Sequence, residues 1–369
     1  MNSTKKKVLF IIPTTNPGGI ETYVLRFLNY IQNNELIEPI LLVRSINKGE
    51  LSAEYEKLNI QIYYKPLGYF NLKNIINYLN LFKENKFDTI CDFNANFAGV
   101  PVFLGKIAGI KNRITFYRQG KNHFKANLFK NFYNKLSNYL VYKYSTKILS
   151  NSKASIDFFF ANRFVDDRFK VIYNGLDIES IDKINVSSNN LKQEINIPEN
   201  AFIVCHSGRL DKAKNHTAIL NLAKKAIEQD NSIYFIICGL GTEQLMGRIQ
   251  ELGIQNNFRI LGYRKDIPQI LKSSNLFYFP SYTEGQPNAL IEAIVCGLPF
   301  IASNIAPITE IIPIEFDNLL VDPDDTDKAL ELLFLIKKNE IENNFKNSKI
   351  WASNFFSHNI RFLEFVNCL

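Results

Sequence analysis

Short apolar runs alternate with helix-length segments along almost all of this 369-residue chain. Each run has the length and the β-branched and aromatic content of a buried strand. Strands that alternate with helices form parallel sheets with helices on both faces, so the predicted fold class is α/β. The expected strands are residues 8–12, 39–43, 60–64, 89–92, 114–117, 148–151 and 170–172 in the first half, and 202–206, 234–238, 259–261, 276–279, 300–302 and 318–321 in the second.

The chain length and the 46% hydrophobic content are typical of two domains with separate cores. Residues 176–199 are polar and rich in Asn and Ser, which favours a linker there. We therefore predict a first domain over 1–175 and a second over 200–349, followed by an aromatic-rich helical segment over 350–369.

Two carboxylates, Glu284 and Glu292, stand eight positions apart on either side of a Gly and a Pro. An expected strand precedes them, and a helix is predicted from Ala289 onward, with Pro287 suited to the first turn. Backbone amides at a helix N-terminus attract anions, and carboxylates accept hydrogen bonds from sugar hydroxyls. The pattern suits a sugar attached to a diphosphate. A surface Glu beside an ordinary helix cap is the alternative.

A basic loop follows the expected strand at 202–206 and precedes a helix predicted from Thr217 to Gln229. It contains Gly208, Arg209 and Lys214. Open α/β sheets bind ligands at the carboxyl ends of their strands, where two cations suit a diphosphate. Arg and Lys in a loop are usually solvated, so this loop alone is a weak indication of a diphosphate site. The indication is strong because the Glu284–Glu292 pattern lies in the same half of the chain.

Two glycines, Gly18 and Gly19, follow the first expected strand and precede a helix predicted from Ile20. They allow the backbone to approach a ligand closely. No third glycine stands where a dinucleotide-binding fingerprint requires one. A tight turn is the plainer interpretation.

Together these segments resemble the retaining glycosyltransferases of family 4. The resemblance rests on Gly18–Glu21, Ser150–Ser152, Asn174–Asp177, Gly208–Asn215, Gly239–Gly241, Leu261–Tyr263 and Glu284–Glu292. Bacterial capsule, exopolysaccharide and O-antigen enzymes are the most similar. The resemblance implies the GT-B fold, in which two Rossmann-like doubly wound domains face each other across a cleft and the final helix crosses back to the first domain. One departure is Gln286, where the family usually has an aromatic or aliphatic residue.

The family implies a hexosyltransferase that moves a sugar from a UDP- or GDP-sugar to a saccharide acceptor, often lipid-linked, in surface polysaccharide synthesis. Arg209, Lys214 and Glu284 are the catalytic candidates: the cations hold the diphosphate, and the carboxylate holds the transferred sugar. Glu292 takes the ribose hydroxyls. The donor-binding candidates are Gly18, Gly19, Gly208, Tyr263, Arg264, Gly285, Gln286, Pro287, Asn288, Ala289, Leu290 and Glu292.

The acceptor side departs from the family, whose members often place a His after the fifth strand. Arg118 occupies that position here, and His123 comes five residues later. Because Arg cannot accept a proton, the base is His123 or Asp92, or the leaving diphosphate oxygen takes the proton itself. These three residues are the acceptor-side candidates. No cofactor and no metal are expected, since basic residues and helix dipoles neutralise the leaving group in this fold.

Charge is distributed unevenly: residues 1–180 carry 25 Lys and Arg against 14 Asp and Glu, and the remainder carries 18 against 22. Residues 93–156 contain eleven cations and no acid, and apolar residues recur at helical spacing from Phe124 to Leu140. A basic, aromatic, amphipathic helix suits an anionic membrane surface. A core-facing helix with a solvated cationic back is the equal alternative. The acidic second half disfavours nucleic-acid binding.

No segment reaches the length of a membrane span, and the five cysteines show no paired spacing, which predicts a cytoplasmic protein, with peripheral membrane attachment left open. Two other functions also stay open. A sugar-nucleotide epimerase shares the GT-B fold, and a non-catalytic nucleotide-sugar-binding protein would tolerate Arg118 and Gln286 at their unusual positions.

Overall fold

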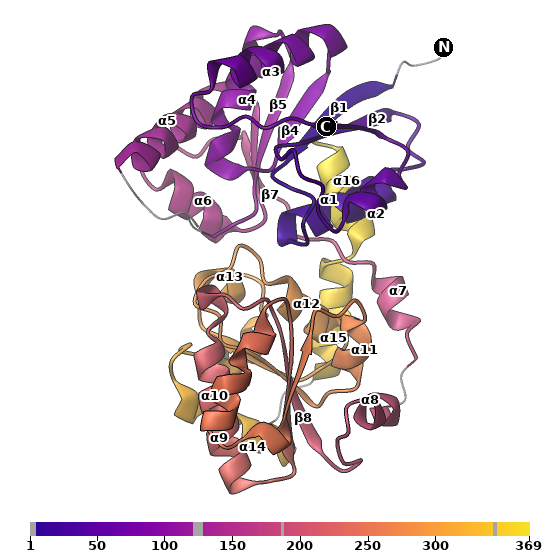
Figure 1. The fold of residues 1–369 in the computed structure, drawn as a ribbon, viewed down its shortest axis with the longest axis vertical. Helices are drawn as coiled ribbons and strands as arrows, with labels where there is room; N and C mark the ends of the chain where they lie inside the picture. Colours follow the sequence, from indigo (N-terminus) through magenta and orange to yellow (C-terminus); the bar gives the residue numbers. More distant parts are fainter. Residues whose placement is uncertain (1–4, 121–127, 186–187, 342–344) are drawn as a thin grey trace. The chain divides into compact units, whose positions relative to one another are not determined.

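The computed structural model describes residues 5–120, 128–185, 188–341 and 345–369. The chain divides into two compact units (Figure 1). Unit 1 comprises Met1–Asn174 together with Arg361–Leu369, and unit 2 comprises Gly175–Ile360. Each unit has its own parallel sheet, so the α/β prediction with two Rossmann-like domains is confirmed.

Unit 1 contains a seven-stranded parallel sheet in the order β3-β2-β1-β4-β5-β6-β7. Its strands are β1 (Lys6–Ile12), β2 (Ile37–Val43), β3 (Gln61–Tyr64), β4 (Thr89–Asp92), β5 (Asn112–Tyr117), β6 (Lys147–Ser150) and β7 (Phe169–Val171). Its helices are α1 (Gly19–Tyr30), α2 (Ser52–Glu56), α3 (Leu72–Asn85), α4 (Gly99–Ile107), α5 (Leu128–Tyr144) and α6 (Lys153–Phe160). The strand order reverses between β1 and β4, so the loops that follow these two strands begin at the topological switch point.

The inner strands of this sheet, from β2 to β6 in the spatial order, are mostly buried on both faces, which is why they contain long apolar runs. Phe10 of β1 packs into the cluster that contains Phe27 of α1, whereas Leu9 and Ile11 pack with Tyr78 of α3 on the opposite face. The alternation along β1 therefore builds two separate layers of core. Helices cover both.

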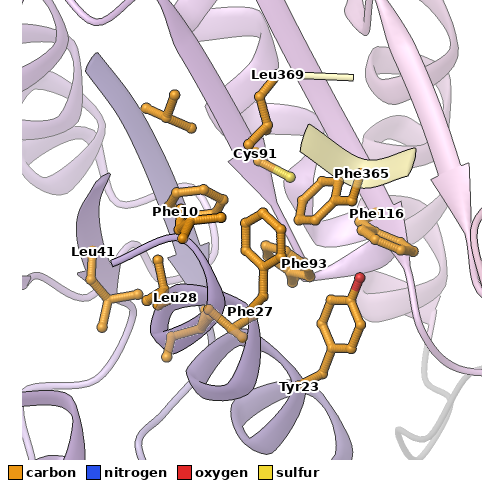
Figure 2. Close-up of a cluster of buried hydrophobic side chains, with 14 of the residues drawn as sticks. Phe10, Tyr23, Phe27, Leu28, Leu41, Cys91, Phe93, Phe116, Phe365 and Leu369 are labelled. Atoms are coloured by element: carbon orange, nitrogen blue, oxygen red, sulfur yellow. The ribbon is translucent and has the colours of Figure 1, made fainter. Parts of the chain in front are cut away.

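The last nine residues of the chain complete the core of unit 1 (Figure 2). Phe365, on α16 (His358–Val366), is fully buried, with its ring centroid 4.5 Å from that of Phe27 and 5.3 Å from that of Phe116. The backbone is anchored as well, since the Leu369 carbonyl accepts a hydrogen bond from Thr89 Oγ1 at 3.1 Å. The expected return of the final helix to the first domain is confirmed.

The tail differs from the expected single helix, because α15 (Phe345–Phe355) ends before α16 begins. Between them, Leu176 N donates to Phe356 O at 2.8 Å, and His358 N donates to Leu176 O at 2.9 Å. These bonds form an isolated parallel bridge between Leu176 and Ser357. The strand-like bridge takes backbone groups that a continuous helix would use.

Unit 2 contains a six-stranded parallel sheet in the order β10-β9-β8-β11-β12-β13. Its strands are β8 (Phe202–Ser207), β9 (Ile233–Cys238), β10 (Phe258–Gly262), β11 (Leu276–Phe279), β12 (Phe300–Ser303) and β13 (Leu320–Val321). Its helices include α7 (Ile178–Asp182), α8 (Ser188–Glu194), α9 (His216–Gln229), α10 (Met246–Glu251), α11 (Ile267–Lys272), α12 (Asn288–Val295), α13 (Ala306–Thr309) and α14 (Thr326–Lys337). Here the order reverses between β8 and β11.

The segment expected as a linker, 176–199, contains α7 and α8 and falls within unit 2. Lys272 ties it down, because its ammonium donates to Ile181 O at 2.6 Å and to Ile184 O at 2.9 Å. A polar composition therefore marks two short surface helices here. All five cysteines are free thiols. Among the described residues, the helices are too short or too polar to cross a bilayer.

Candidate active site

Two loops begin side by side at the switch point of unit 2. One runs from β8 to α9 and carries Arg209 and Lys214, and the other runs from β11 to α12 and carries Glu284. The two strands are direct neighbours, with Phe277 paired to Cys205. The loops are also bonded to each other, since Tyr282 N donates to Ala213 O at 2.8 Å. The sheet therefore brings the basic loop and the carboxylate loop together.

Lys214 and Glu284 form an ion pair, with 2.6 Å between Nζ and Oε1. Their side chains are 20% and 10% exposed, so the pair is shielded from solvent. The ammonium also lies 4.9 Å from the ring centroid of Phe279, at the end of β11. A Lys has three N–H donors, and one of them meets Glu284. The sequence predicts that Lys214 binds the diphosphate and that Glu284 binds the transferred sugar. In the structure the two side chains also bind each other.

Arg209 is held much less firmly than Lys214. Its side chain is 62% exposed, and its Nη2 lies 3.7 Å from Asp211 Oδ2. An exposed pair at this distance contributes little to stability. The guanidinium is therefore free to reorient, and its expected role as a diphosphate ligand stays a prediction.

Gly208 and Gly239 allow the β8 and β9 loops to pack against each other. A Cβ on Gly239, whose φ is +154°, would lie 2.0 Å from Gly208 O. A Cβ on Gly208 would lie 2.9 Å from His206 Nε2 and 3.4 Å from Lys214 Cδ. Both positions thus require glycine, and Gly208 lies directly beside the stem of Lys214.

Two buried histidines, His206 and His216, support this loop. His206 Nδ1 lies 3.0 Å from Tyr278 O, so Nδ1 carries the proton that this carbonyl accepts. Burial, followed by the nearby His216, lowers the pKa of His206 to about 3, so this ring is neutral. Its ring stacks on Phe279, at 5.8 Å between centroids, next to the aromatic face that holds Lys214. His206 thus packs behind the site.

The helix that follows Glu284 begins at Asn288, so Pro287 is its N-cap residue and not a first-turn residue. Asn288 N donates to Gln286 O at 3.0 Å, which tightens the turn. Leu290 is fully buried and Gln286 is 6% exposed. Leu290 could therefore meet a donor only through its main chain. The expected contacts of Gly285, Gln286, Pro287, Asn288, Ala289, Leu290 and Glu292 stay predictions.

Tyr263 and Arg264 follow β10 at the same edge of the sheet. Tyr263 is 46% exposed. Arg264 pairs with both Asp266 and Glu194, each at 2.6 Å, and these hydrogen bonds raise the pKa of its guanidinium further. Because two carboxylates neutralise Arg264, a main-chain contact suits it better than a charge contact. Glu194, on α8, was not foreseen as a partner.

The glycine loop of unit 1 encloses a carboxylate that sequence reasoning had left aside. Glu21 is 7% exposed and accepts a hydrogen bond from Thr14 Oγ1 at 3.0 Å. A Cβ on Gly18 would lie 2.4 Å from Glu21 Oε2, whereas one on Gly19 would meet nothing within 4 Å. Gly18 therefore leaves room for Glu21, and Gly19 is the one with open space beside it.

Asp92 ends β4 and is fully buried. Its Oδ1 accepts hydrogen bonds from Asn94 N at 2.8 Å and from Asn94 Nδ2 at 2.7 Å, while Oδ2 has no partner among the described residues. Burial raises the pKa of Asp92. A carboxyl group with a raised pKa is a stronger base once ionised, which suits the proton acceptor that was predicted.

Arg118 follows β5 and is also buried, at 9% exposure. Its guanidinium lies 3.4 Å from the ring centroid of Tyr23, and its Nη2 donates to Asn174 Oδ1. Burial lowers the pKa of Arg118 to about 10, so it remains a cation at neutral pH. It cannot serve as the base. His123, the other candidate, lies outside the described residues.

The basic helix α5 has a clear buried face formed by Tyr133, Ser137 and Val141. This face lies one residue beyond the expected apolar line, so Phe132 is 62% exposed and Tyr139 is 41% exposed. The helix thus packs on the core and still presents aromatic rings to solvent. The buried face agrees with a core-facing helix, and attachment of the exposed rings to a membrane stays a prediction.

Family models match both halves of the chain: one described as "Glycosyltransferase Family 4" over residues 17–180, and one described as "Glycosyl transferases group 1" over residues 187–350. The chain is 28% identical to the capsular polysaccharide biosynthesis glycosyltransferase CapH of Staphylococcus aureus, covering 83% of each chain. It is 27% identical to the UDP-Gal:alpha-D-GlcNAc-diphosphoundecaprenol alpha-1,3-galactosyltransferase of Escherichia coli, covering 74% of this chain and 72% of the relative.

The fold is similar to that of Anabaena Alr3699/HepE, solved in complex with UDP, with a TM-score of 0.83 at 20% identity over 98% of each chain. The family predicted from the motifs and the predicted enzyme class are confirmed. The chain belongs to the family 4 glycosyltransferases of GT-B fold and is a hexosyltransferase.

Proposed function

We propose that this enzyme transfers a hexosyl unit, with retention of configuration, from a nucleotide-diphosphate sugar to a saccharide acceptor carried on a lipid, in surface polysaccharide synthesis. The observation that carries the donor assignment is the shielded Lys214–Glu284 pair at the switch point of unit 2. The names of the S. aureus and E. coli relatives support the pathway and the acceptor class.

Lys214 has the right chemistry for the leaving diphosphate. Glu284 fixes one N–H of its ammonium, which leaves two to donate to phosphate oxygens. Arg209 follows the same strand on a loosely held side chain and adds a second cation when a donor binds. Charge that develops on the diphosphate is stabilised most by donors already in place, so Lys214 contributes more than Arg209.

The two carboxylates suit the hydroxyl groups of the donor. Glu284 accepts from the transferred sugar through lone pairs not used by Lys214, and Glu292 accepts from the ribose. The N-terminal amides of α12 lie between them in sequence and favour negative charge. The acceptor hydroxyl loses its proton to Asp92, to His123 or to the leaving diphosphate oxygen.

A screen of UDP-, GDP- and ADP-sugars tests the donor assignment. A UDP- or GDP-sugar is expected to raise the melting temperature further as its concentration increases, because it binds the folded state. NMR of the product formed with that donor is then expected to show the donor's anomeric configuration. Conversion of the donor without any acceptor would indicate an epimerase, and binding without transfer or hydrolysis would indicate a non-catalytic protein.

The enzyme is also proposed to attach to anionic membranes through the exposed aromatic rings and cations of unit 1. Flotation is expected to carry it with phosphatidylglycerol vesicles and not with phosphatidylcholine vesicles, because acidic headgroups attract the basic surface. Phe132→Ser should weaken the attachment. Ile314→Ser, which changes an 83% exposed residue of unit 2, should leave it unchanged. Absence of binding to both vesicle types would refute this attachment.

A further inference from the structure

Among the described residues, Arg118 is buried and has fewer hydrogen-bond acceptors than the partly buried Arg113 and Arg168 of the same unit. Arg113, on the same strand, donates to the carbonyls of Tyr144, at 2.9 Å, and Ile110. Arg168 pairs with Asp166 at 2.9 Å. Among the described residues, Arg118 donates to Asn174 alone, and its Nε and Nη1 are buried without a hydrogen-bond partner. Three of its five N–H groups are therefore unmet.

The charge of Arg118 is also uncompensated. Within the described parts of the chain, it forms no ion pair with a carboxylate. The ionisable groups that act on it are Tyr23 and Cys91, and burial raises the pKa of both, so they are neutral at pH 7. Asp92, at the end of the neighbouring strand, has Arg44 as its charge partner. A buried cation without an anion is costly, and proteins usually pair it.

A second unmet group lies at the end of the adjacent strand. Tyr117 of β5 pairs with Ser150 of β6, so Arg118 and Asn151 are the next residues along these neighbouring strands. Asn151 is 2% exposed, and its Oδ1 has no hydrogen-bond partner within the part of the chain that the structure describes. An Asn amide presents an NH₂ group when it turns over, and then donates as Arg118 does.

We propose that Arg118, assisted by Asn151 and Asn174, binds a negatively charged oxygen group of the acceptor. A carboxylate or phosphate would supply the acceptors that the guanidinium lacks and would neutralise its charge. Two sources have this chemistry: the carboxylate of an acidic sugar and the phosphate of a lipid diphosphate. The inference rests on the proposed function, since it describes the acceptor of that reaction.

Three small probes separate the sources: methyl glucoside, methyl glucuronide and glucose 1-phosphate. Their binding to the full-length enzyme is measured by calorimetry, with and without saturating UDP, which occupies the diphosphate site of unit 2. At least one anionic probe is expected to bind about tenfold or more tightly than methyl glucoside, the scale of a hydrogen bond to a charged group. Preference for the glucuronide identifies an acidic sugar, and preference for the phosphate identifies a phosphorylated acceptor.

Variants locate the effect. Arg118→Gln should abolish the anion preference, and Arg118→Lys should keep part of it. Arg163→Gln, which removes an exposed cation from the same unit, should keep it fully. Arg118→Gln is expected to have a melting temperature no lower than that of the wild type, since it removes an uncompensated buried charge. If Arg118 had only a structural role, the same substitution would lower the melting temperature.

The inference is overturned if anionic and neutral probes behave alike with the wild type, including no binding by any of them, or if Arg118→Gln retains the preference. UDP binding is read separately by its own melting shift. Loss of that shift would count against the donor assignment alone, because the probe comparison is also made without UDP.

Discussion

Replacing Lys214 by Ala is expected to lower turnover by about a hundredfold or more. Lys214 is the better-held cation of the β8 loop, fixed by Glu284 at 2.6 Å and by the face of Phe279. Removing one preorganised donor to a developing anion typically costs a factor of ~10² to 10³ in turnover. Steady-state kinetics with the best donor from the nucleotide-sugar screen would measure the loss.

Lys212→Ala is the matched control, because Lys212 lies in the same loop but is exposed. It should retain turnover within a few-fold of wild type. The double variant Lys214→Met, Glu284→Gln removes both charges together, so it should fold at least as well as Lys214→Ala and remain inactive. Turnover of Lys214→Ala close to that of the wild type would remove this residue from the mechanism.

Replacing Phe365 by Ala is expected to destabilise unit 1 by about 3–5 kcal/mol, the usual cost of removing a buried Phe ring. Phe365 is fully buried against Phe27, Phe93 and Phe116. The readouts can be separated by unit. Hydrogen exchange of the β1 amides reports on unit 1, and the fluorescence of Trp351, the single tryptophan, reports on unit 2.

Leu363→Ala is the control on the same helix, since Leu363 is 53% exposed. It should leave β1 exchange nearly unchanged. If Phe365→Ala left β1 exchange as slow as in the wild type, the helix would be an addition to the surface of unit 1 and not part of its core.

In the described parts of the chain, each of the thirteen strands overlaps a predicted run, because most of them are buried parallel strands whose apolar run has a clear beginning and end. The runs at 89–92 and 276–279 match β4 and β11 residue for residue. The last strand is the least well predicted. Residues Ile314–Leu319 form a 3-10 helix, so only Leu320–Val321 of the expected 318–321 is strand.

The convergence of the two site loops was also predictable, because it follows from strand order and the ligand-binding edge of a parallel sheet. Contacts between distant side chains were not. No local pattern indicates that Lys214 meets Glu284, or that Arg264 meets Glu194, 70 residues away in each case. The interruption between α15 and α16 was not predictable for a similar reason, since it depends on the bridge between Ser357 and the distant Leu176.

The insertion of α16 into unit 1 sets an order of events during protein synthesis. The seven strands of that unit leave the ribosome first, but Phe362, Phe365 and Leu369 follow only after the whole of Gly175–Ile360 has been translated. At roughly 5–20 residues per second, this delay is about ten seconds or longer. Until then the apolar face of β1 and α1 lacks its cover, so the nascent first half exposes a surface to which chaperones bind.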